Sequence, residues 1–307
     1  MGFEAWQQYR SVHTPAFDVV AQGEYNSDVH MEVSVSHDKD DGLSGEATIY
    51  NLAEDKWTQL SEGDPFRIEL GYRGEITKPV IFGEVGTKQP GQVDGADTAY
   101  KFSGADESEK RIKEVRETES WEEPTVDFIA RDLARLADLR PGRITVPGGV
   151  IGDSWSISQQ STLDHWFDRI VEEAEDLGDE KYEWYATRGQ VNVVPKAEDV
   201  GAQIDVLTED KQGNVLDSGE VEGKEKKSDG GSNVEVEALL DPQIEKDALV
   251  PIRTEKINGV YRIVNYSLTS STENGDHEME LEAAPTDSEY RYQPAGQQTD
   301  AGIARPY

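Results

Sequence analysis

The chain of 307 residues contains no cysteine. Without a thiol, disulfide bonds, thiol catalysis and cysteine-based zinc sites are all excluded. Long apolar runs are missing too, since no stretch approaches the roughly 20 apolar residues that a helix needs to cross a bilayer. Residues 1–9 lack the charged start and the apolar run of a signal peptide. We therefore expect no membrane span and no secretory leader.

Basic residues are scarce: 30 Lys and Arg stand against 63 Asp and Glu, which gives a formal net charge of −33. Binding to nucleic acid needs clustered Lys and Arg that neutralise phosphates. The basic runs are short, and the one at 224–227 lies in a polar segment that is typical of a solvated turn rather than of a DNA contact. We therefore expect no specific binding of nucleic acid.

The acidic excess allows two interpretations. Acidic sequences with few aromatic residues form disordered, solvating tails. Here the acids alternate with periodic apolar residues, and six Trp, twelve Tyr and seven Phe indicate packed cores. A folded chain of this charge repels itself at low salt, whereas at molar salt the Debye length is about 3 Å and the repulsion is screened. The composition therefore predicts a halophilic setting: a haloarchaeal or halophilic bacterial cell, or a virus of such a host.

Residue patterns typical of catalysis or ligand binding are absent as well. None of the five histidines forms the i, i+4 pair of a helical zinc site, and Ser154 and Ser161 lack the Gly-x-Ser-x-Gly setting of a nucleophile. Residues 38–42 resemble the start of a calcium loop, but Ile49 stands where the loop needs a bidentate Glu. No Gly-rich phosphate loop opens a helix. We therefore expect no catalytic residue, no cofactor-binding residue, no metal site and no enzyme.

Alternation with a period of two dominates the first third of the chain. Apolar and polar residues alternate over 29–35 and 66–70, as in a strand with one buried and one wet face. Further short strands are expected at 45–50, 80–85 and 100–104, with a short amphipathic helix at 53–61. This pattern predicts a first β-barrel over 29–105, preceded by an N-terminal arm over 1–28.

The remaining two thirds change period twice. Helical spacing predicts helices over 125–139 and 161–177, the second with Ser161 and Asp164 in capping-box positions, and a hairpin over 182–194. We therefore expect an α/β insert over 106–200. Short strands then return, which predicts a second β-barrel over 201–288 and a C-terminal tail over 289–307. The expected fold class is mainly β, with two related β-barrels flanking a small α+β domain.

Two ordered sets of residues carry a resemblance to a known family. The resemblance is to the tail hub, or baseplate hub, proteins of tailed viruses, the late-control-protein D family in the broad sense. The first set is Ile49-Tyr50-Asn51-Leu52, Trp57, Leu60, Gly63-Asp64, Phe66, Ile68, Gly71-Tyr72-Arg73-Gly74, Ile81-Phe82-Gly83 and Val85. The second is Val236, Leu239-Leu240-Asp241-Pro242, Ile244, Val250, Ile252, Asn258-Gly259 and Tyr261-Arg262-Ile263. The insert matches only in its layout of helix followed by strand.

The resemblance implies a structural virion protein. Family members form a homotrimeric ring at the end of the tail, in which two similar barrels per subunit present a pseudo-sixfold face to the sixfold tube. The implied partners are a distal tail or tube protein, the tape-measure protein and a spike- or fibre-bearing tip protein. The implied place is the virion tail tip, after assembly in the host cytoplasm, where the ring gates genome ejection. The motif residues with an implied structural and non-catalytic role are Asn51, Trp57, Gly71, Tyr72, Phe82, Gly83, Pro242, Gly259 and Tyr261.

Five aromatic residues lie in otherwise polar segments: Trp6, Tyr9, Trp121, Tyr290 and Tyr292. One interpretation is that they pack against their own domain. The other is that they anchor contacts between subunits, where aromatic residues concentrate. The C-terminal pair equally suits a frayed end or an arm that becomes ordered on a neighbour.

Two other functions compete with the hub. A cell-envelope-degrading enzyme of a tail tip would need an additional block with a nucleophile or a metal cluster, and the sequence offers neither. A halophilic binding β-domain unrelated to viruses would share the alternation and the charge. Because such a domain has no need to form a trimer, its oligomeric state in high salt distinguishes it from a hub.

Overall fold

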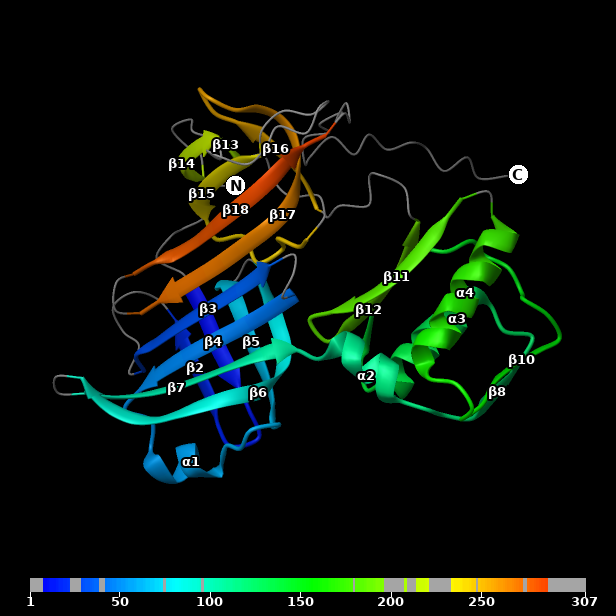
Figure 1. Cartoon of the computed structure of the whole chain (residues 1–307), viewed down its shortest axis with the longest axis horizontal. Coiled ribbons are helices and arrows are strands. Elements are labelled where there is room, and N and C mark those ends of the chain that lie inside the picture. The colour runs from blue at the N-terminus through cyan, green and yellow to red at the C-terminus, as the bar shows by residue number, and fades with distance from the viewer. Residues whose placement is uncertain are drawn as a thin grey trace, which may run out of the picture.

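The computed structural model describes residues 8–22, 29–38, 42–73, 76–94, 97–178, 180–195, 207–208, 214–220, 233–246, 248–272 and 275–286. These residues form a β body and an α/β insert, which lie side by side (Figure 1). The body and the insert each enclose a hydrophobic core of their own. None of the described helices is long and apolar enough to cross a membrane.

The β body consists of two units with the same strand order. The first unit contains β3 (Met31–Asp38), β4 (Gly42–Tyr50), α1 (Glu54–Gln59), β5 (Pro65–Tyr72), β6 (Thr77–Asp94) and β7 (Asp97–Asp106). The second contains β14 (Val215–Glu220), β15 (Val234–Leu239), β16 (Leu249–Arg253), β17 (Asn258–Ser271) and β18 (His277–Pro285). Neighbouring strands follow the order β3-β4-β7-β6-β5 in the first unit and β14-β15-β18-β17-β16 in the second. The chain therefore has the predicted fold class, with two related β units that flank an α/β insert.

The likeness of the two units extends to their register. Val85 of β6 lies opposite Gly104 of β7, and Ile263 of β17 lies opposite Ala283 of β18. Directly after Val85, and directly after Ile263, the strand contains a bulge. A bulge inserts one extra residue and increases the local twist, so both units bend the same strand at the same place.

A direct strand pair joins the two units. β17 of the second unit pairs antiparallel with β3 of the first, beginning with Tyr266 opposite His37. One continuous sheet therefore crosses the boundary, and both units contribute to one apolar core. β3 buries Met31, Val33 and Val35 in that core and turns the residues between them outward, as the alternation predicts.

A hairpin of β1 (Gln8–His13) and β2 (Asp18–Gln22) extends the sheet on the side of the first unit, because β1 pairs with β5. Both strands fall within residues 1–28, the predicted N-terminal arm. Along the main path of the sheet, β2 and β14 are the terminal strands among the described residues. A short strand, β13 (Leu207–Thr208), pairs with β16.

The insert packs two long helices against short strands. Its elements are α2 (Ser108–Glu114), β8 (Glu119–Glu122), α3 (Val126–Leu136), β9 (Arg140–Ile144), β10 (Ser154–Ile157), α4 (Leu163–Leu177), β11 (Tyr182–Thr187) and β12 (Gln190–Pro195). The predicted helices and hairpin are confirmed as α3, α4 and β11–β12. The predicted capping box is wrong, because Thr162 is the N-cap of α4 and its side chain makes no capping bond.

Candidate functional site

Asn51 closes β4 and holds the first residues of β7. Its backbone adopts a φ of 56°, a left-handed conformation that asparagine tolerates better than most other residues. Its Nδ2 donates to Oδ1 of Asp97 at 2.6 Å, and its Oδ1 accepts from the backbone N–H of Thr98 at 3.0 Å. Asn51 therefore links the end of β4 to the start of β7.

Trp57 fixes helix α1 to the β6–β7 hairpin. Its side chain is buried, and its ring centroid lies 5.2 Å from that of Tyr100 on β7. Lys88 of β6 places Nζ 4.8 Å from the Trp57 ring centroid and donates to the carbonyl oxygens of Trp57 and Leu60 at 2.5 and 2.7 Å. The last carbonyls of a helix lack partners within the helix, so Lys88 caps α1 while it holds the hairpin.

Gly71 and Tyr72 connect the first unit to β18 of the second. Gly71 has a φ of 147°, and a Cβ at this position would lie 1.9 Å from the carbonyl oxygen of Ile76, so only glycine suits it. The Gly71 carbonyl oxygen lies 3.1 Å from Nε2 of His277. The ring of Tyr72 meets the His277 ring edge-on, with centroids 4.9 Å apart. The Gly-Tyr motif thus contacts both units.

Arg10 and His277 form a buried polar cluster at the same boundary. Nε of Arg10 donates to Oγ of Ser270 at 2.8 Å, and the guanidinium also donates to the side-chain oxygen of Gln8. Oγ of Ser270 lies 2.7 Å from Nδ1 of His277. Burial lowers the pKa of Arg10 to about 10, and burial together with the Arg10 charge lowers the pKa of His277 to about 3. At neutral pH the cluster therefore holds a charged Arg10 beside a neutral His277.

Phe82 and Gly83 lie side by side on β6, where the first unit meets the insert. A Cβ on Gly83 would lie 2.2 Å from the carbonyl oxygen of Ala105, so the glycine lets β6 and β7 approach closely. Phe82 packs against the core of the insert, and its ring centroid lies 4.9 Å from the guanidinium carbon of Arg111. Phe82 is therefore an apolar contact between the body and the insert.

Arg188 ties the insert to both β units. It lies at the turn of the β11–β12 hairpin, with a φ of 55°, and its side chain is buried. Its backbone N–H donates to Oδ2 of Asp106, the last residue of β7, at 2.5 Å. Its guanidinium donates to the carbonyl oxygens of Pro242 and Ile244, the first at 3.2 Å. It also donates to the hydroxyl of Tyr266 at 2.9 Å. A buried guanidinium held by this many partners favours one orientation of the insert.

The second-unit motif residues fall into two places. Pro242 meets Arg188 through its carbonyl oxygen. Gly259 lies on β17 opposite Ile252 of β16, and Tyr261, partly buried, packs against the core of the body. The structure therefore brings Phe82 and Pro242 to the insert boundary, whereas Gly259 and Tyr261 belong to the β16–β17 pair.

Of the aromatic interface candidates, Trp6, Tyr290 and Tyr292 lie outside the described residues. Tyr9 is partly buried on β1, where it pairs with Gly71 of β5. Its neighbours in the sheet therefore belong to its own chain.

Trp121 packs within the insert. It lies on β8 and is 9% exposed. Its ring centroid lies 5.6 Å from that of Trp155 on β10, and its Nε1 donates to Oδ2 of Asp132 on α3 at 3.0 Å. These contacts favour packing against its own domain, the first of the two interpretations.

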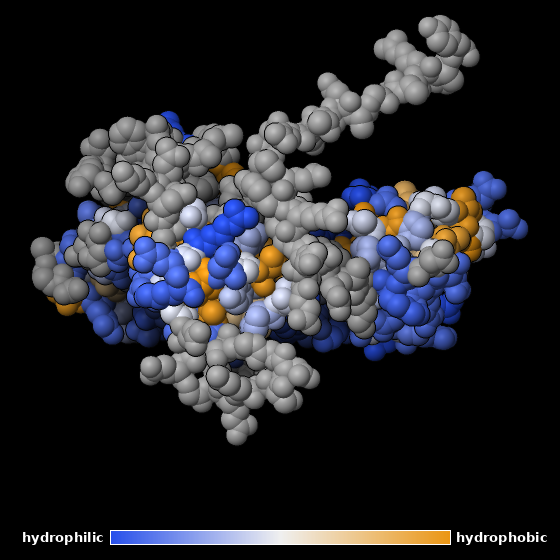
Figure 2. Space-filling view, turned by 90° about the horizontal axis from the view of Figure 1, so that it is seen from above, coloured by the Kyte–Doolittle hydropathy of each residue, from blue (hydrophilic) through white to orange (hydrophobic). Residues whose placement is uncertain are grey.

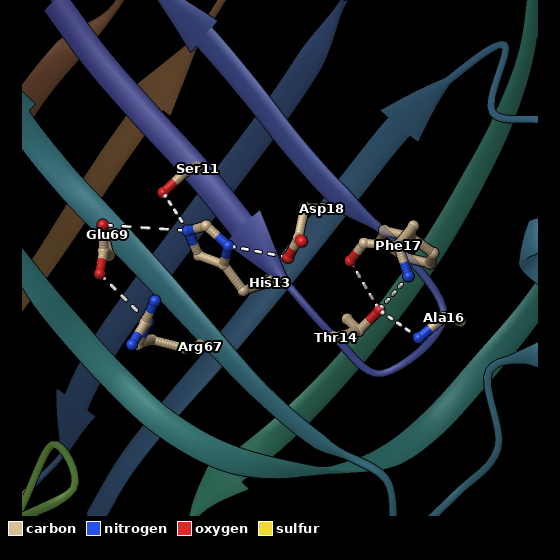
Figure 3. Close-up of polar contacts among 8 residues, drawn as sticks. All are labelled: Ser11, His13, Thr14, Ala16, Phe17, Asp18, Arg67 and Glu69. Atoms are coloured by element: carbon tan, nitrogen blue, oxygen red, sulfur yellow. Dashed lines mark hydrogen bonds and ion pairs between the residues drawn. The ribbon is translucent and has the colours of Figure 1, made fainter.

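A Ser-His-Asp arrangement occurs on the β1–β2 hairpin (Figure 3). Nε2 of His13 lies 3.0 Å from Oγ of Ser11, and Nδ1 lies 2.9 Å from Oδ1 of Asp18, the order of atoms in a serine hydrolase. Ser11, however, is 0% exposed, and Oε2 of Glu69 lies 3.9 Å from the same Nε2. A carboxylate there opposes the negative charge of an acyl-transfer intermediate. The arrangement connects β1 with β2 and β5 and offers no accessible hydroxyl to a substrate.

An acidic groove of about 560 Å³ lies on the outer face of the second unit. Glu235 and Glu237 of β15 lie directly opposite Glu282 and Glu280 of β18. Like charges in this position destabilise a sheet. In the part of the chain that the structure describes, no group of three or more possible ligands is placed to hold a metal ion. Figure 2 shows that hydrophilic residues also cover much of the visible described surface of the insert.

Sequence reasoning missed three buried residues: Arg10, Arg188 and the neutral His277. Arg188 belongs to the predicted hairpin turn, but the hydrogen-bond partners of its guanidinium are 54 to 78 residues away in the sequence. Contacts over such distances in the sequence leave no local residue pattern. The one feature of the sequence that could have pointed to Arg188 is a large cationic residue next to glycine in a tight turn.

No protein-family model matches the chain, and no curated protein matches it either. Solved structures do. The 43 kDa tail protein of prophage MuSo2 from Shewanella oneidensis gives a TM-score of 0.51 at 12% identity, over 91% of this chain and 98% of that chain. The tail protein from Neisseria meningitidis MC58 gives a TM-score of 0.50 at 11% identity, over 91% of this chain and 97% of that chain. The chain therefore has the fold of these two tail proteins.

Proposed function

We propose that this chain is a structural subunit of a viral tail: a homotrimeric tail hub, or baseplate hub, at the tail tip. The observation that carries the proposal is the internal duplication, in which β14-β15-β18-β17-β16 repeats the order β3-β4-β7-β6-β5. Three copies of a chain with two like units supply six like units. A threefold ring can thereby meet a sixfold tube through nearly equivalent contacts.

The fold and the motif residues support the same proposal. The chain shares its fold with two tail proteins over nearly their full lengths. Four motif residues from the late-control-protein D resemblance make contacts between parts of the chain: Gly71 and Tyr72 contact β18, and Phe82 and Pro242 contact the insert. We assign to them the task of holding the two units and the insert in one arrangement.

The partners follow from the place of such a ring. Its sixfold face closes the distal tail or tube protein, its lumen meets the end of the tape-measure protein, and its threefold face carries a spike- or fibre-bearing tip protein. The ring gates genome ejection through its lumen. From the net charge of −33 per chain we infer that the virus infects a host that grows in brine, and we propose a haloarchaeon as that host.

The oligomeric state tests the proposal. Light scattering combined with size exclusion, at salt concentrations from low to molar, should give the mass of a trimer at molar salt. A chain that stays monomeric across the whole range overturns the proposal and favours a halophilic binding β-domain. A zymogram on host envelope tests the enzymatic rival, and a cleared band would overturn the structural assignment.

A further inference from the structure

The joint between the two units of one chain defines which strand edges fit together. β17 pairs with β16 along Asn258–Arg262, and beyond its bulge it leaves β16 and pairs with β3. β17 is the fourth strand in the order of its unit, and β3 is the first strand in the order of the other unit. The joint is thus a contact between a fourth strand and a first strand.

The same two edges occur a second time in the chain. The fourth strand of the first unit is β6, which pairs with β5 only as far as Glu84. Beyond its bulge, among the described residues, β6 has a strand partner on one side only, namely β7. The first strand of the second unit is β14, which ends the main path of the sheet. β6 lies far from β14 in the sheet, because β15, β18, β17, β3, β4 and β7 stand between the two strands (Figure 1).

We propose that the distal half of β6 in one copy pairs with β14 of the next copy, repeating between chains the β17–β3 pair within each chain. The proposal rests on the trimer of the proposed function and specifies its seam. Three joints inside chains and three between chains then alternate around six units. A contact between two different surfaces closes into a ring if its rotation returns to the start, and under this proposal the joints inside and between chains share one rotation.

The register of the seam follows from the duplication. Thr269 of β17 lies opposite Ser34 of β3. In the other unit the place of Thr269 is taken by Gln92. Gln92 lies opposite Ala99, five residues before Gly104, as Thr269 lies opposite Glu278, five residues before Ala283. β6 reaches this position through a second bulge, between Gln89 and Gln92, that β17 lacks. The place of Ser34 is taken by Gly219, which faces Glu235 as Ser34 faces Glu46. Gln92 of one copy therefore lies opposite Gly219 of the next.

Exposed apolar side chains mark both edges. Val93 at the end of β6 is 81% exposed, and Leu216 of β14 is 50% exposed. The β6–β7 hairpin projects beyond the rest of the first unit, so its end is accessible to a neighbour (Figure 1). A long edge strand that presents apolar side chains is a site for pairing with another chain. The rival edge is β2, whose Val20 is 40% exposed, but β2 has no counterpart in the joint inside the chain.

Charge makes the seam dependent on salt. Asp217 of β14 lies close to this edge, where Nζ of Lys256 lies 3.8 Å from its Oδ1 and donates to the Ser218 carbonyl oxygen at 3.0 Å, and each chain carries a net charge of −33. Acidic copies repel one another at low salt, whereas ions screen this repulsion beyond about 3 Å at 1 M. The fraction of assembled chains should therefore rise with salt concentration.

Because the chain has no cysteine, paired cysteines test the seam cleanly. The test variant carries Gln92→Cys and Gly219→Cys; no atom lies within 4 Å of a Cβ added at Gly219. Directly opposite residues of an antiparallel pair have Cα atoms about 4.5–5.5 Å apart, a distance that a disulfide spans. Mild oxidation at molar salt should give covalent trimers on a non-reducing gel and a peptide linking 92 to 219.

Control variants separate the possible failures. Gln92→Cys alone should not form covalent trimers, and Val20→Cys with Gly219→Cys tests the rival edge. A trimer by light scattering without the 92–219 link, or with a 20–219 link instead, overturns the seam and leaves the proposed hub standing. A monomer at all salt concentrations overturns both. A covalent ladder that continues past three copies supports the seam and overturns the closed trimer.

A second measurement does not need a disulfide. Gln92→Cys and Val20→Cys, each made singly, are labelled with a bulky maleimide after folding. The label at 92 should abolish the trimer, and the label at 20 should leave it intact. Intact trimers with the label at 92 contradict the seam.

Discussion

The guanidinium of Arg188 donates a hydrogen bond to the hydroxyl of Tyr266 at 2.9 Å, although Arg188 belongs to the insert and Tyr266 to the second β unit. Tyr266 is also the residue at which β17 begins to pair with β3. The side chain that orients the insert therefore contacts the joint between the units. A change in that joint and a change in the insert are coupled through this pair.

Replacement of Arg188 by Met should destabilise the chain. The variant keeps an apolar stem but leaves the carbonyl oxygens of Pro242 and Ile244 without their donor. Breaking a buried charged network by removal of one partner costs roughly 3–5 kcal/mol in the free energy of unfolding. Urea unfolding at molar salt measures the loss.

The matched control for Arg188 is Arg169→Met. Arg169 lies on α4, about half exposed, and pairs with Glu172 and Glu173 of the same helix. Exposed pairs of this kind contribute about 0.3–0.5 kcal/mol. If both variants lose stability equally, Arg188 does not hold the insert as described.

Acid should destabilise the chain through His277. Its pKa is lowered from 6.5 to about 3 by burial and by Arg10, so the unfolded chain binds a proton in the interval where the folded chain does not. The contribution of neutral His277 is complete above pH 6.5 and is lost as the pH falls toward 3. A shift of this size corresponds to an upper limit of about 5 kcal/mol. The free energy of unfolding, measured by urea from pH 7 to 4, should decline accordingly.

His277→Gln isolates this effect. Glutamine can still donate toward the carbonyl oxygen of Gly71 but does not titrate. The difference in unfolding free energy between wild type and variant should shrink as the pH falls from 7 to 4. A difference that stays constant over this range contradicts the neutral state of His277.

Gly71→Ala should prevent normal folding or cost at least about 3 kcal/mol, since it combines a strained backbone with a collision. The φ of 147° is one that side chains rarely adopt, and the new Cβ would lie 1.9 Å from the carbonyl oxygen of Ile76. Gly148→Ala is the control, because a Cβ there meets no atom within 4 Å. Thermal melting of both variants at molar salt makes the comparison, and similar melting temperatures would refute the role given to Gly71.

Glu237→Gln should stabilise the chain at low salt. Glu237 lies opposite Glu280, and after burial it is the next cause of the raised pKa of Glu278. Removing the repulsion between two like charges that lie directly opposite each other in a sheet should raise the free energy of unfolding by roughly 0.2–1 kcal/mol. The gain should fade as salt approaches 1 M, because the repulsion is then screened. Glu62→Gln, at an exposed loop position, is the control, and an equal gain there would contradict the local origin of the repulsion.

The sequence predicts the β units well because their strands follow a local rule. The alternation at Met31, Val33 and Val35 reports a buried face directly. β1 lacks this signal, since it buries Gln8 and Arg10, whose partners Ser270 and Gly275 lie some 260 residues further along the chain. Polar residues that are buried through distant partners look like surface residues in a one-dimensional pattern.

The contacts between the two β units could not be predicted from the sequence for a related reason. The motif residues Gly71 and Tyr72 identify the end of a strand, but the contact of Tyr72 with His277 depends on how the two units pack. Similarly, Ser161 and Asp164 match a capping box, yet the helix takes Thr162 as its N-cap. Local chemistry allows several such choices, and tertiary packing selects among them.

Electron microscopy of the assembled chain at molar salt tests the central claim most directly, because it shows both the number of copies and the repeat of units within them. The account predicts a closed ring of three copies in which six similar β lobes surround the axis, with one insert for every two lobes. Particles of a single copy, or rings whose lobes do not repeat sixfold, would contradict it.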